Sequence, residues 1–415
     1  MILNHLRRWS LLATLLLGIS GCSVMFESEP QAPETGRSEG RILIVVSLSR
    51  FSHPSDHAKA AATVQQMVTD FRSLHPNARI SYRLLRAGEI DDLGMAQARS
   101  GLGPDLILMS AANLGRLRRL GVIQEAPSLT PEQLHNFSPA SLAAVRDHQQ
   151  LLALPAYENL MLMCYDRSVV PAAPQNLDDL VSLASQGQQI GLHNNLSVLH
   201  WVTSALGLDF SHRPRRPSPA TALLNWSRWL TWAQVSPNVT MTSFSDLIYT
   251  GLQDGRYDLI SCPAFWLPSL RHSLGNRLGI APLPSGPAGP GRPITDLIVW
   301  AFGRNSSLQQ RTLAMDFALF TTNAEQQRRV ILRHQSLMPV NPEVRLPLKS
   351  YPDLRTLNQV SRDSELVGLP REEALQAINP TITHLLDRVM AGELPAAREA
   401  PRLLNLLDPP DRSQP

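Results

Sequence analysis

The chain has 415 residues, of which 43% are hydrophobic and 18% are charged, and its formal net charge is +3. These values are typical of a globular protein and exclude a disordered chain. Lysine occurs only at Lys59 and Lys349, so the basic charge is carried by scattered arginines, and no nucleic-acid surface is expected. A chain of this length exceeds one ordinary hydrophobic core, so two lobes are predicted.

The amino terminus has the pattern of a bacterial lipoprotein signal. Arg7 and Arg8 precede an apolar run at 11–19, which is shorter than the roughly 20 residues that span a bilayer. The run ends in Ile19-Ser20-Gly21-Cys22, which matches a lipobox and predicts lipidation of Cys22. Residues 1–21 are therefore expected to be the signal peptide and residues 22–40 a lipidated tether. A plain signal peptide with a chance cysteine is the alternative.

The first half of the remaining chain alternates between strands and helices. Strands are predicted at 42–47, 79–85 and 105–109, with helices at 58–75 and 90–99 between them. This βαβαβ order predicts a parallel sheet that binds ligands beyond the carboxyl ends of its strands. Those ends are residues 47–51 and 110–113.

A second set of elements begins after Leu151. Strands are predicted at 189–193, 258–262 and 296–302, and helices at 197–206, 220–234, 308–321 and 323–333. The rest of the chain to Leu407 is expected to be mostly helical. Trp226, Trp229 and Trp232 share one helix face, and Trp300 lies within a strand, so all four are expected to pack in the core.

Several stretches resemble the family of extracellular solute-binding proteins that includes the maltose-binding protein. The similarity covers most of residues 42–345, and no single motif carries it. The matching stretches are Phe71 to Ala78, Gly103-Pro104-Asp105-Leu106, Leu120-Gly121-Val122-Ile123, Leu154-Pro155-Ala156-Tyr157 with Tyr165-Asp166-Arg167, Ala281-Pro282-Leu283-Pro284, Gly303-Arg304-Asn305-Ser306, and Gln335 to Val340. The chain departs from the family at Thr295-Asp296, where paired glycines are common, and at Ala264, where an aromatic residue is common.

The resemblance implies an α/β fold of the periplasmic-binding-protein type II class, with two lobes around a central ligand cleft and hinge crossovers. It implies an N-lobe of residues 41–155 plus 283–322 and a C-lobe of residues 156–282 plus 323–415. The implied function is capture of a sugar or sugar-like osmolyte, of the oligosaccharide, disaccharide or glucosylglycerol type, by a monomer. The implied partners are the ligand, the membrane subunits of an ABC-type permease and, through Cys22, the membrane of the cell envelope or periplasm.

Sugar recognition requires aromatic faces and convergent polar groups. The aromatic candidates are Phe51, Tyr157, Phe265 and Trp266, because they fall at strand ends or a crossover, and a core position is the alternative for each. Trp266 and Tyr157 are expected to contact the ligand, with Trp266 stacking on it. The polar candidates, for which helix caps or surface roles are the alternative, are Ser49, Ser110, Asn113, Glu158, Asn194, Asn195, Asp296 and Ser336.

The sequence contains no recognisable set of catalytic residues. His53 and His57 are four residues apart, but Pro54 disfavours a helix that would align them as metal ligands. No Gly-x-Ser-x-Gly motif occurs, and Gly101-Leu102-Gly103 precedes a strand, the wrong context for a dinucleotide loop. We therefore expect a binding protein without enzyme activity, cofactor or metal. A solute-binding protein for glycerol phosphate, a polyamine or another charged solute, and a ligand sensor without a transport role, remain alternatives.

Cys164 and Cys262 are the two cysteines beyond the lipobox. In a fold of this family, their strands are expected to be antiparallel, with Cys262 at the cleft end and Cys164 several residues away from it. At about 3.3 Å per residue, this offset exceeds the ~7 Å Cα separation that a disulfide tolerates. The sequence therefore predicts two free thiols.

Overall fold

The structure is a computed structural model that describes residues 38–48, 54–86, 89–90, 92, 96, 100–208 and 218–407. The predicted signal peptide, the lipidation site Cys22 and nearly all of the predicted tether lie outside the described residues, as do the predicted ligand residues Ser49 and Phe51. None of the described helices is both long and apolar enough to cross a membrane.

The first lobe is built on a seven-stranded sheet with the order β14-β7-β13-β3-β1-β2, and β4 pairs with β13. Its strands are β1 (Gly40–Leu48), β2 (Ala78–Arg86), β3 (Leu106–Ser110), β4 (Ile123–Gln124), β7 (Ala153–Asn159), β13 (Asp296–Gly303) and β14 (Met338–Pro339). The predicted parallel pairing of the first three strands is confirmed, because β1 pairs in parallel with both β2 and β3. β13 and β7 add antiparallel neighbours, so the complete sheet is mixed.

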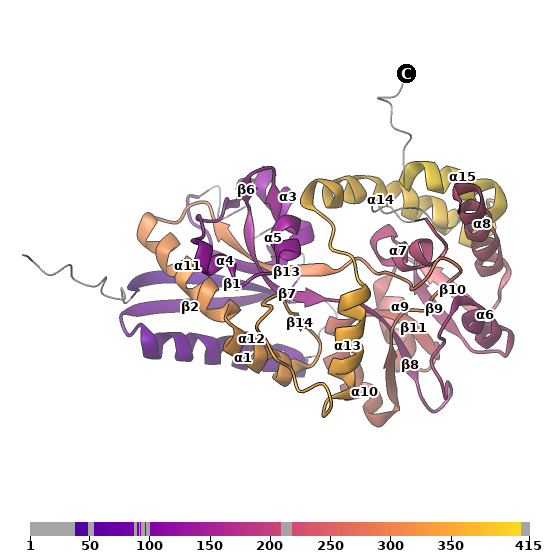
Figure 1. The fold of residues 1–415 in the computed structure, drawn as a ribbon, viewed down its shortest axis with the longest axis horizontal. Helices are drawn as coiled ribbons and strands as arrows, with labels where there is room; N and C mark the ends of the chain where they lie inside the picture. Colours follow the sequence, from indigo (N-terminus) through magenta and orange to yellow (C-terminus); the bar gives the residue numbers. More distant parts are fainter. Residues whose placement is uncertain are drawn as a thin grey trace, which may run out of the picture. The chain divides into compact units, whose positions relative to one another are not determined.

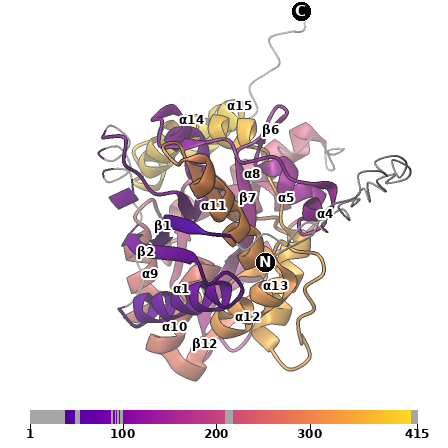
Figure 2. The same ribbon diagram turned by 90° about the vertical axis from the view of Figure 1, so that its left-hand side faces the viewer.

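Helices pack against this first sheet, as Figure 2 shows for α1 beside β2 and α11 beside β1. They are α1 (Pro54–Leu74), α3 (Leu114–Arg119), α4 (Pro131–Leu134), α5 (Pro139–Ala144), α11 (Leu308–Thr322) and α12 (Ala324–His334), with the 3-10 turn η1 (Ala111–Asn113) after β3. Val64, Met67, Val68 and Phe71 recur at helical spacing along α1, and all four are buried. The short hairpin β5 (Arg146–Asp147) and β6 (Gln150–Leu151) forms a separate sheet.

The second lobe is built on a five-stranded sheet with the order β10-β9-β11-β8-β12. Its strands are β8 (Met161–Asp166), β9 (Ile190–His193), β10 (Val239–Thr242), β11 (Leu259–Pro263) and β12 (Leu278–Ala281). Its helical elements are α6 (Leu177–Ser185), α7 (Leu196–Ala205), α8 (Pro219–Val235), α9 (Ser245–Gln253), α10 (Leu267–Leu274), and the 3-10 turns η2 (Ala264–Trp266) and η3 (Gly275–Arg277).

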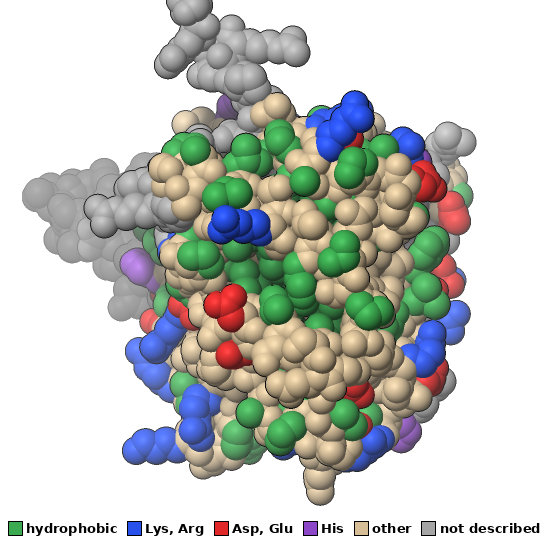
Figure 3. Space-filling view, turned by 90° about the vertical axis from the view of Figure 1, so that its right-hand side faces the viewer, with side chains coloured by type: hydrophobic (Ala, Val, Ile, Leu, Met, Phe, Trp, Pro, Cys, Tyr) green, Lys and Arg blue, Asp and Glu red, His purple; other side chains and the backbone are tan. Residues whose placement is uncertain are grey.

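The carboxyl-terminal helices are α13 (Pro352–Asp363), α14 (Leu369–Met390) and α15 (Ala396–Leu407). In Figure 1, α15 lies beside α8, and α14 runs above α7, as the contacts between these elements require. The prediction of core tryptophans is confirmed for Trp226, Trp229 and Trp300, which are buried, whereas Trp232 is half-buried. Figure 3 shows hydrophobic side chains in a hollow on one face, with acidic and basic side chains dispersed around it.

The chain passes between the sheets at positions that differ from the predicted lobe boundaries. β7 continues to Asn159 in the first sheet, although the N-lobe was predicted to end at residue 155. β14 also pairs with β7, although residues from 323 onward were predicted to belong to the C-lobe. Backbone pairing therefore keeps both segments in the first sheet, whereas sequence pattern does not indicate which sheet a short strand joins.

The prediction of free thiols is wrong, because Cys164 and Cys262 form a disulfide with their Cα atoms 5.8 Å apart. The expected antiparallel pairing of β8 and β11 is confirmed, but Cys262 lies opposite Leu162, only two residues before Cys164. Residues two apart on a strand share one face of the sheet, so the two side chains point to the same side. The error was in the register, since an offset of two residues leaves the Cα atoms within bridging distance.

Candidate functional site

Two adjoining cavities, of about 380 and 410 Å³, lie at the ends of strands from both sheets. Ser110, Phe265 and Asp296 line both cavities. Ser110 ends β3, Asp296 begins β13, and Phe265 follows β11. The cavities therefore meet where the strand-end rule places ligands in α/β sheets.

The first cavity is mostly apolar. Its lining includes Val46, Leu48, Ala60, Val64, Met67, Leu108, Ile298, Trp300, Phe317, Val330 and Leu337. Tyr157 also lines it and is 3% exposed, and its hydroxyl has no hydrogen-bond partner among the described residues. Burial raises the pKa of this hydroxyl. The hydroxyl is thus a buried donor and acceptor without a protein partner among the described residues.

The second cavity, the polar cavity, has more polar lining residues than the first, although apolar side chains still form the larger part of its surface. Its polar lining residues are Ser110, Asn159, His193, Asn195, Ser245, Thr295, Asp296, Glu372, Gln376 and Asn379. These side chains come from strand ends of both sheets, from the starts of α7 and α9, and from α14, which lies far from the strands in the chain. The hydroxyl and amide groups among them offer both donors and acceptors to a polar solute.

Asp296 is held by a short hydrogen-bond network at the junction of the cavities. Ser110 Oγ donates to Asp296 Oδ1 over 2.5 Å, and Asn159 Nδ2 donates to Asp296 Oδ2 over 3.3 Å. The backbone N–H of Phe265 donates to Asn159 Oδ1 over 3.2 Å. Burial raises the pKa of Asp296, and the hydrogen bonds from Ser110 and Asn159 partly oppose this shift. The network fixes the Asp296 carboxylate and the Phe265 backbone relative to each other.

Glu372, near the start of α14, is the second carboxylate of the polar cavity. Burial raises its pKa, as does the charge of Asp296, while the hydrogen bond from Gln376 Nε2 lowers it. That bond measures 3.2 Å. Each carboxylate therefore lies where its ionised form is disfavoured in the absence of a partner.

His193 ends β9 and is neutral near pH 7. Burial lowers its pKa to about 4, although its backbone hydrogen bond with Ser261 acts in the opposite direction. Ser261 Oγ also lies 3.2 Å from His193 Nδ1. A neutral imidazole contributes hydrogen-bonding capacity to the cavity but no positive charge.

The two adjacent aromatic residues after β11 have different environments. Phe265 is 37% exposed and lines both cavities, whereas Trp266 is 2% exposed and lines only the polar one. The Trp266 ring packs 5.1 Å from the Tyr249 ring and 5.5 Å from the His193 ring, measured between centroids. Phe265 is therefore the ring with an available surface, while most of Trp266 is part of the packed core of the second lobe.

The structure brings many of the predicted ligand residues together. Those that line at least one cavity are Ser110, Asn113, Tyr157, Asn195, Phe265, Trp266, Asp296 and Ser336. Two predicted residues line neither cavity. Glu158 accepts a 2.6 Å hydrogen bond from Ser361 Oγ of α13, and the Asn194 amide donates to Asp387 of α14. Both follow cavity-lining neighbours in sequence, but their side chains face helices instead.

Sequence reasoning missed several polar residues of the cavities, among them Asn159, His193, Glu372 and Gln376. Asn159 and His193 each end a strand, so the same strand-end signal that selected their neighbours could have found them. Glu372 and Gln376 lie one helical turn apart on α14, which carries no strand-end signal. Only the position of α14 against the cavity identifies them.

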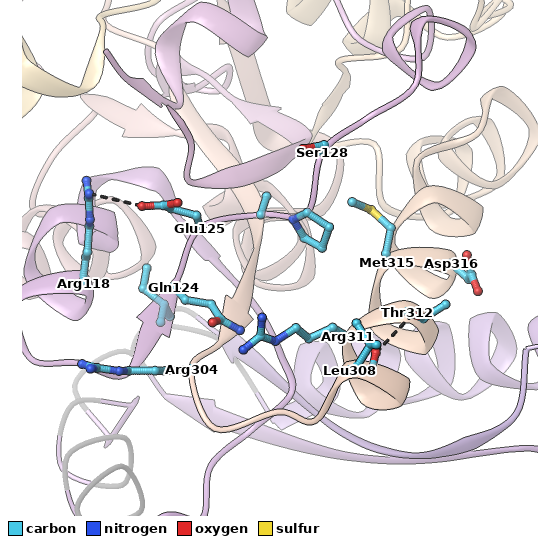
Figure 4. A pocket seen from close by; sticks show the side chains of 13 residues that line it. Arg118, Gln124, Glu125, Ser128, Arg304, Leu308, Arg311, Thr312, Met315 and Asp316 are labelled. Carbon is cyan, nitrogen blue, oxygen red and sulfur yellow. Dashed lines mark hydrogen bonds and ion pairs between the residues drawn. The ribbon is translucent and has the colours of Figure 1, made fainter. Parts of the chain in front are cut away.

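A larger pocket of about 790 Å³ lies at the opposite end of the first sheet, near the end of β13. Figure 4 shows Arg118 reaching Glu125, with Arg304 and Arg311 on the lower wall. Arg118 also pairs with Asp147, and Arg311 donates to the Ser306 carbonyl. The strand-end rule places no ligand at this end of the sheet. Among the described residues, no group of three or more His, Cys, Asp or Glu is arranged to hold a metal ion.

Comparisons with known proteins identify a family and a fold. A profile of the family described as "Bacterial extracellular solute-binding protein" matches residues 66–356. No curated protein sequence matches the chain. An extracellular solute-binding protein from Staphylococcus aureus, solved with maltose, is 17% identical, with a TM-score of 0.62, over 88% of this chain and 96% of that one.

Two further solved structures are similar. A cyclo/maltodextrin-binding protein complexed with maltotetraose is 15% identical, with a TM-score of 0.70, over 91% of this chain and 99% of that one. The maltose-maltodextrin binding protein of Alicyclobacillus acidocaldarius is 16% identical, with a TM-score of 0.67, over 89% of this chain and 100% of that one. At these identities the similarity establishes the two-lobed fold of periplasmic binding proteins, as predicted from the sequence.

Proposed function

Because the chain belongs to the family of bacterial extracellular solute-binding proteins, we propose that it captures a sugar or sugar-like osmolyte in the two adjoining cavities and delivers it to the permease subunits of an ABC-type importer. The family consists of binding proteins, not enzymes. The observation that carries the choice of ligand is the Phe265 ring, which is exposed at the junction of the cavities beside a fixed carboxylate. An aromatic face next to oriented acceptors is the combination that a pyranose ring requires.

The neighbouring structures support the same class of ligand, since their descriptions name maltose and maltotetraose. In this chain, the ligand residues that we propose are Ser110, Asn113, Asn159, Phe265 and Asp296, with Tyr157 and Ser336 on the apolar side. Asn195, Glu372 and Gln376 complete the polar side. Ser49 and Phe51 keep the role predicted from the sequence.

Helix α14 connects the polar cavity to the first lobe. Gln376 Nε2 donates to the Ala112 carbonyl over 2.7 Å, and Glu373 pairs with Arg119 at 2.9 Å. Arg119 and Ala112 follow β3, whereas α14 packs in the core of the second lobe. We propose that these contacts form when the two lobes close on the ligand, the motion expected of a two-lobed binding protein.

Calorimetry with the mature protein tests the ligand class. We expect heat of binding from at least one neutral mono- or disaccharide or sugar–glycerol osmolyte. The Phe265→Ala variant should bind that ligand about tenfold to a hundredfold more weakly, because a buried ring contact contributes about 1–3 kcal/mol. Phe244→Ala is a matched control, since Phe244 is exposed and lines neither cavity. No binding by any saccharide, or equal losses in both variants, would reject the proposal.

The lipid anchor is a separate part of the proposal and rests on the lipobox at Cys22. Lipidation would hold the protein at a membrane of the cell envelope, because several acyl chains bind a bilayer firmly whereas one binds only marginally. The Cys22→Ser variant should remain unprocessed or appear in the soluble fraction. An unchanged mass and unchanged membrane fractionation would reject lipidation without affecting the ligand proposal. Genes for two permease subunits beside this gene would favour transport over sensing.

A further inference from the structure

The polar cavity has an unbalanced charge. Two carboxylates, Asp296 and Glu372, line it, and its described lining includes neither lysine nor arginine. The remaining titratable residue of this wall is His193, which is buried and neutral near pH 7. Lys59 and His334 line the other, apolar cavity, on α1 and α12. The described lining of the polar cavity therefore holds two acidic groups and no basic group that is charged near pH 7.

Neutral hydrogen bonds do not remove this imbalance. Asp296 receives one donor on each oxygen, from Ser110 and Asn159, and Glu372 receives one from Gln376. A carboxylate has about four lone-pair positions, so both groups retain acceptor capacity. The charge of Asp296 acts on Glu372, and a further hydroxyl donor would leave that repulsion in place. Protonation of one carboxyl would relieve the repulsion, whereas a cationic ligand group relieves it and also forms charge-assisted hydrogen bonds with both carboxylates.

The aromatic side chains of the same wall favour a cation as well. Phe265 presents an exposed ring at the junction of the two cavities, and Trp266 lines the polar cavity behind it. The face of an aromatic ring carries partial negative charge and attracts an ammonium group within about 6 Å of its centroid. Carboxylates and ring faces in one wall therefore select the same ligand group.

We propose that the solute carries a protonated amino group, as in an amino sugar, and that this group binds to Asp296 and Glu372 in the polar cavity while the body of the solute contacts Phe265. This inference rests on the proposed function and narrows its class of ligand. Glu372 is then a specificity-determining residue, because it adds a second charge that a neutral sugar does not need.

Three β-1,4-linked disaccharides with the same backbone test the inference by calorimetry near pH 6.5. Chitosan disaccharide has free amino groups, N,N′-diacetylchitobiose has the same nitrogens without charge, and cellobiose has hydroxyls in their place. Glucosamine and glucose form a smaller matched pair. We expect the amino form of each set to bind at least tenfold more tightly than its neutral counterparts.

The preference should depend on the two carboxylates. Glu372→Gln and Asp296→Asn should each reduce the ratio of affinities between the amino and neutral forms to about threefold or less. Glu393→Gln is the control, since Glu393 lies just beyond the end of α14, pairs with Arg388 in the last turn of that helix and lines neither cavity. Its ratio should equal that of the parent protein. If Asp296→Asn fails to fold, Glu372→Gln carries the test, because Glu372 lies on a helix surface.

The outcomes separate this inference from the proposed function. If neutral sugars bind and the amino forms bind equally or more weakly, or if Glu372→Gln leaves the ratio unchanged, the amino-group inference is wrong and the proposed function stands. If neither amino nor neutral saccharides bind, the proposed function itself is wrong. A second readout needs no variant: the preference should disappear when the pH is raised until the ligand amine is neutral, and binding of the acetylated disaccharide should change little.

Discussion

The two sides of the candidate site are built in different ways. On the side of the second sheet, Trp266 and His193 are almost completely buried, and a disulfide joins β8 to β11 behind them. On the side of the first sheet, Ser110 and Asp296 are partly exposed to the cavities, and hydrogen bonds hold them. Packing and a covalent bond therefore fix the second-lobe wall, whereas the first-lobe wall keeps polar groups available for a ligand.

This difference shows that a cavity-lining position does not by itself identify a ligand residue. Phe265 and Trp266 are neighbours in sequence, and both line the polar cavity, yet their exposed fractions are 37% and 2%. Substitutions in the packed wall should change the free energy of unfolding, and substitutions at the exposed positions should change the affinity.

The largest expected effect is that of Trp266→Ala. Removing a fully buried large aromatic side chain leaves a cavity and costs about 3–5 kcal/mol of unfolding free energy. Phe265→Ala should cost about 1 kcal/mol or less, since much of that ring is already in contact with solvent. Urea denaturation monitored by circular dichroism measures both variants. If Trp266→Ala unfolds at the same urea concentration as the parent protein but binds the ligand more weakly, Trp266 is the stacking residue that the sequence predicted.

The disulfide gives the next effect. The double variant Cys164→Ala with Cys262→Ala should lose about 2–5 kcal/mol of unfolding free energy, because the bond closes a long loop in the unfolded chain. Its sequence separation is 98 residues. Alkylation of the unreduced, denatured protein, followed by mass spectrometry, should modify neither cysteine. Modification of both would contradict the bond and restore the original prediction of free thiols.

His193 should make stability depend on pH. Its pKa is lowered from 6.5 to about 4, so its neutral form is favoured in the folded state. This contribution is fully present above pH 6.5 and is lost as the pH falls toward 4; a shift of this size corresponds to on the order of 3 kcal/mol. The opposite trend comes from Glu158, Asp296 and Glu372, whose raised pKa values reduce stability as the pH rises through them.

The variant His193→Gln separates the two trends. The difference in unfolding free energy between the parent and the variant should be constant above pH 6.5. Between pH 6.5 and 4 the parent should lose stability relative to the variant, because only the parent has a histidine to protonate at position 193. A difference that stays constant across this range would mean that His193 is accessible to solvent in the folded protein.

The smallest effect is expected at the ion pair between Arg119 and Glu373, which joins the two sides of the cavity. Both side chains are substantially exposed, so the pair contributes about 0–1 kcal/mol. Arg119→Ala should therefore weaken ligand binding by no more than about fivefold and leave the radius of gyration of the ligand-free protein unchanged in X-ray scattering, because the pair forms only on closure. A large loss of affinity would show that α14 closes the site mainly through this pair.

Several residues predicted from the sequence line the cavities. Ser110 was predicted because it follows the carboxyl end of a buried strand, and Asp296 because the family resemblance places it at the cleft. Helix α1 and strands β1 to β3 were predicted with small errors at their ends, because their hydrophobic spacing is regular. By contrast, Glu158 and Asn194 were assigned to the cleft because of their position, and the structure turns both toward helices.

The sequence by itself determined the family, the alternation of strands and helices, and the edge of the sheet where polar residues gather. These features depend on local periodicity and on residue order, both of which can be read along the chain. Only the tertiary structure decided the register of β8 against β11, which of Phe265 and Trp266 is exposed, and the approach of Glu372 to Asp296. Each of these depends on the packing of segments between about 75 and 100 positions apart or on the direction of a single side chain, and neither leaves a periodic signal in the sequence.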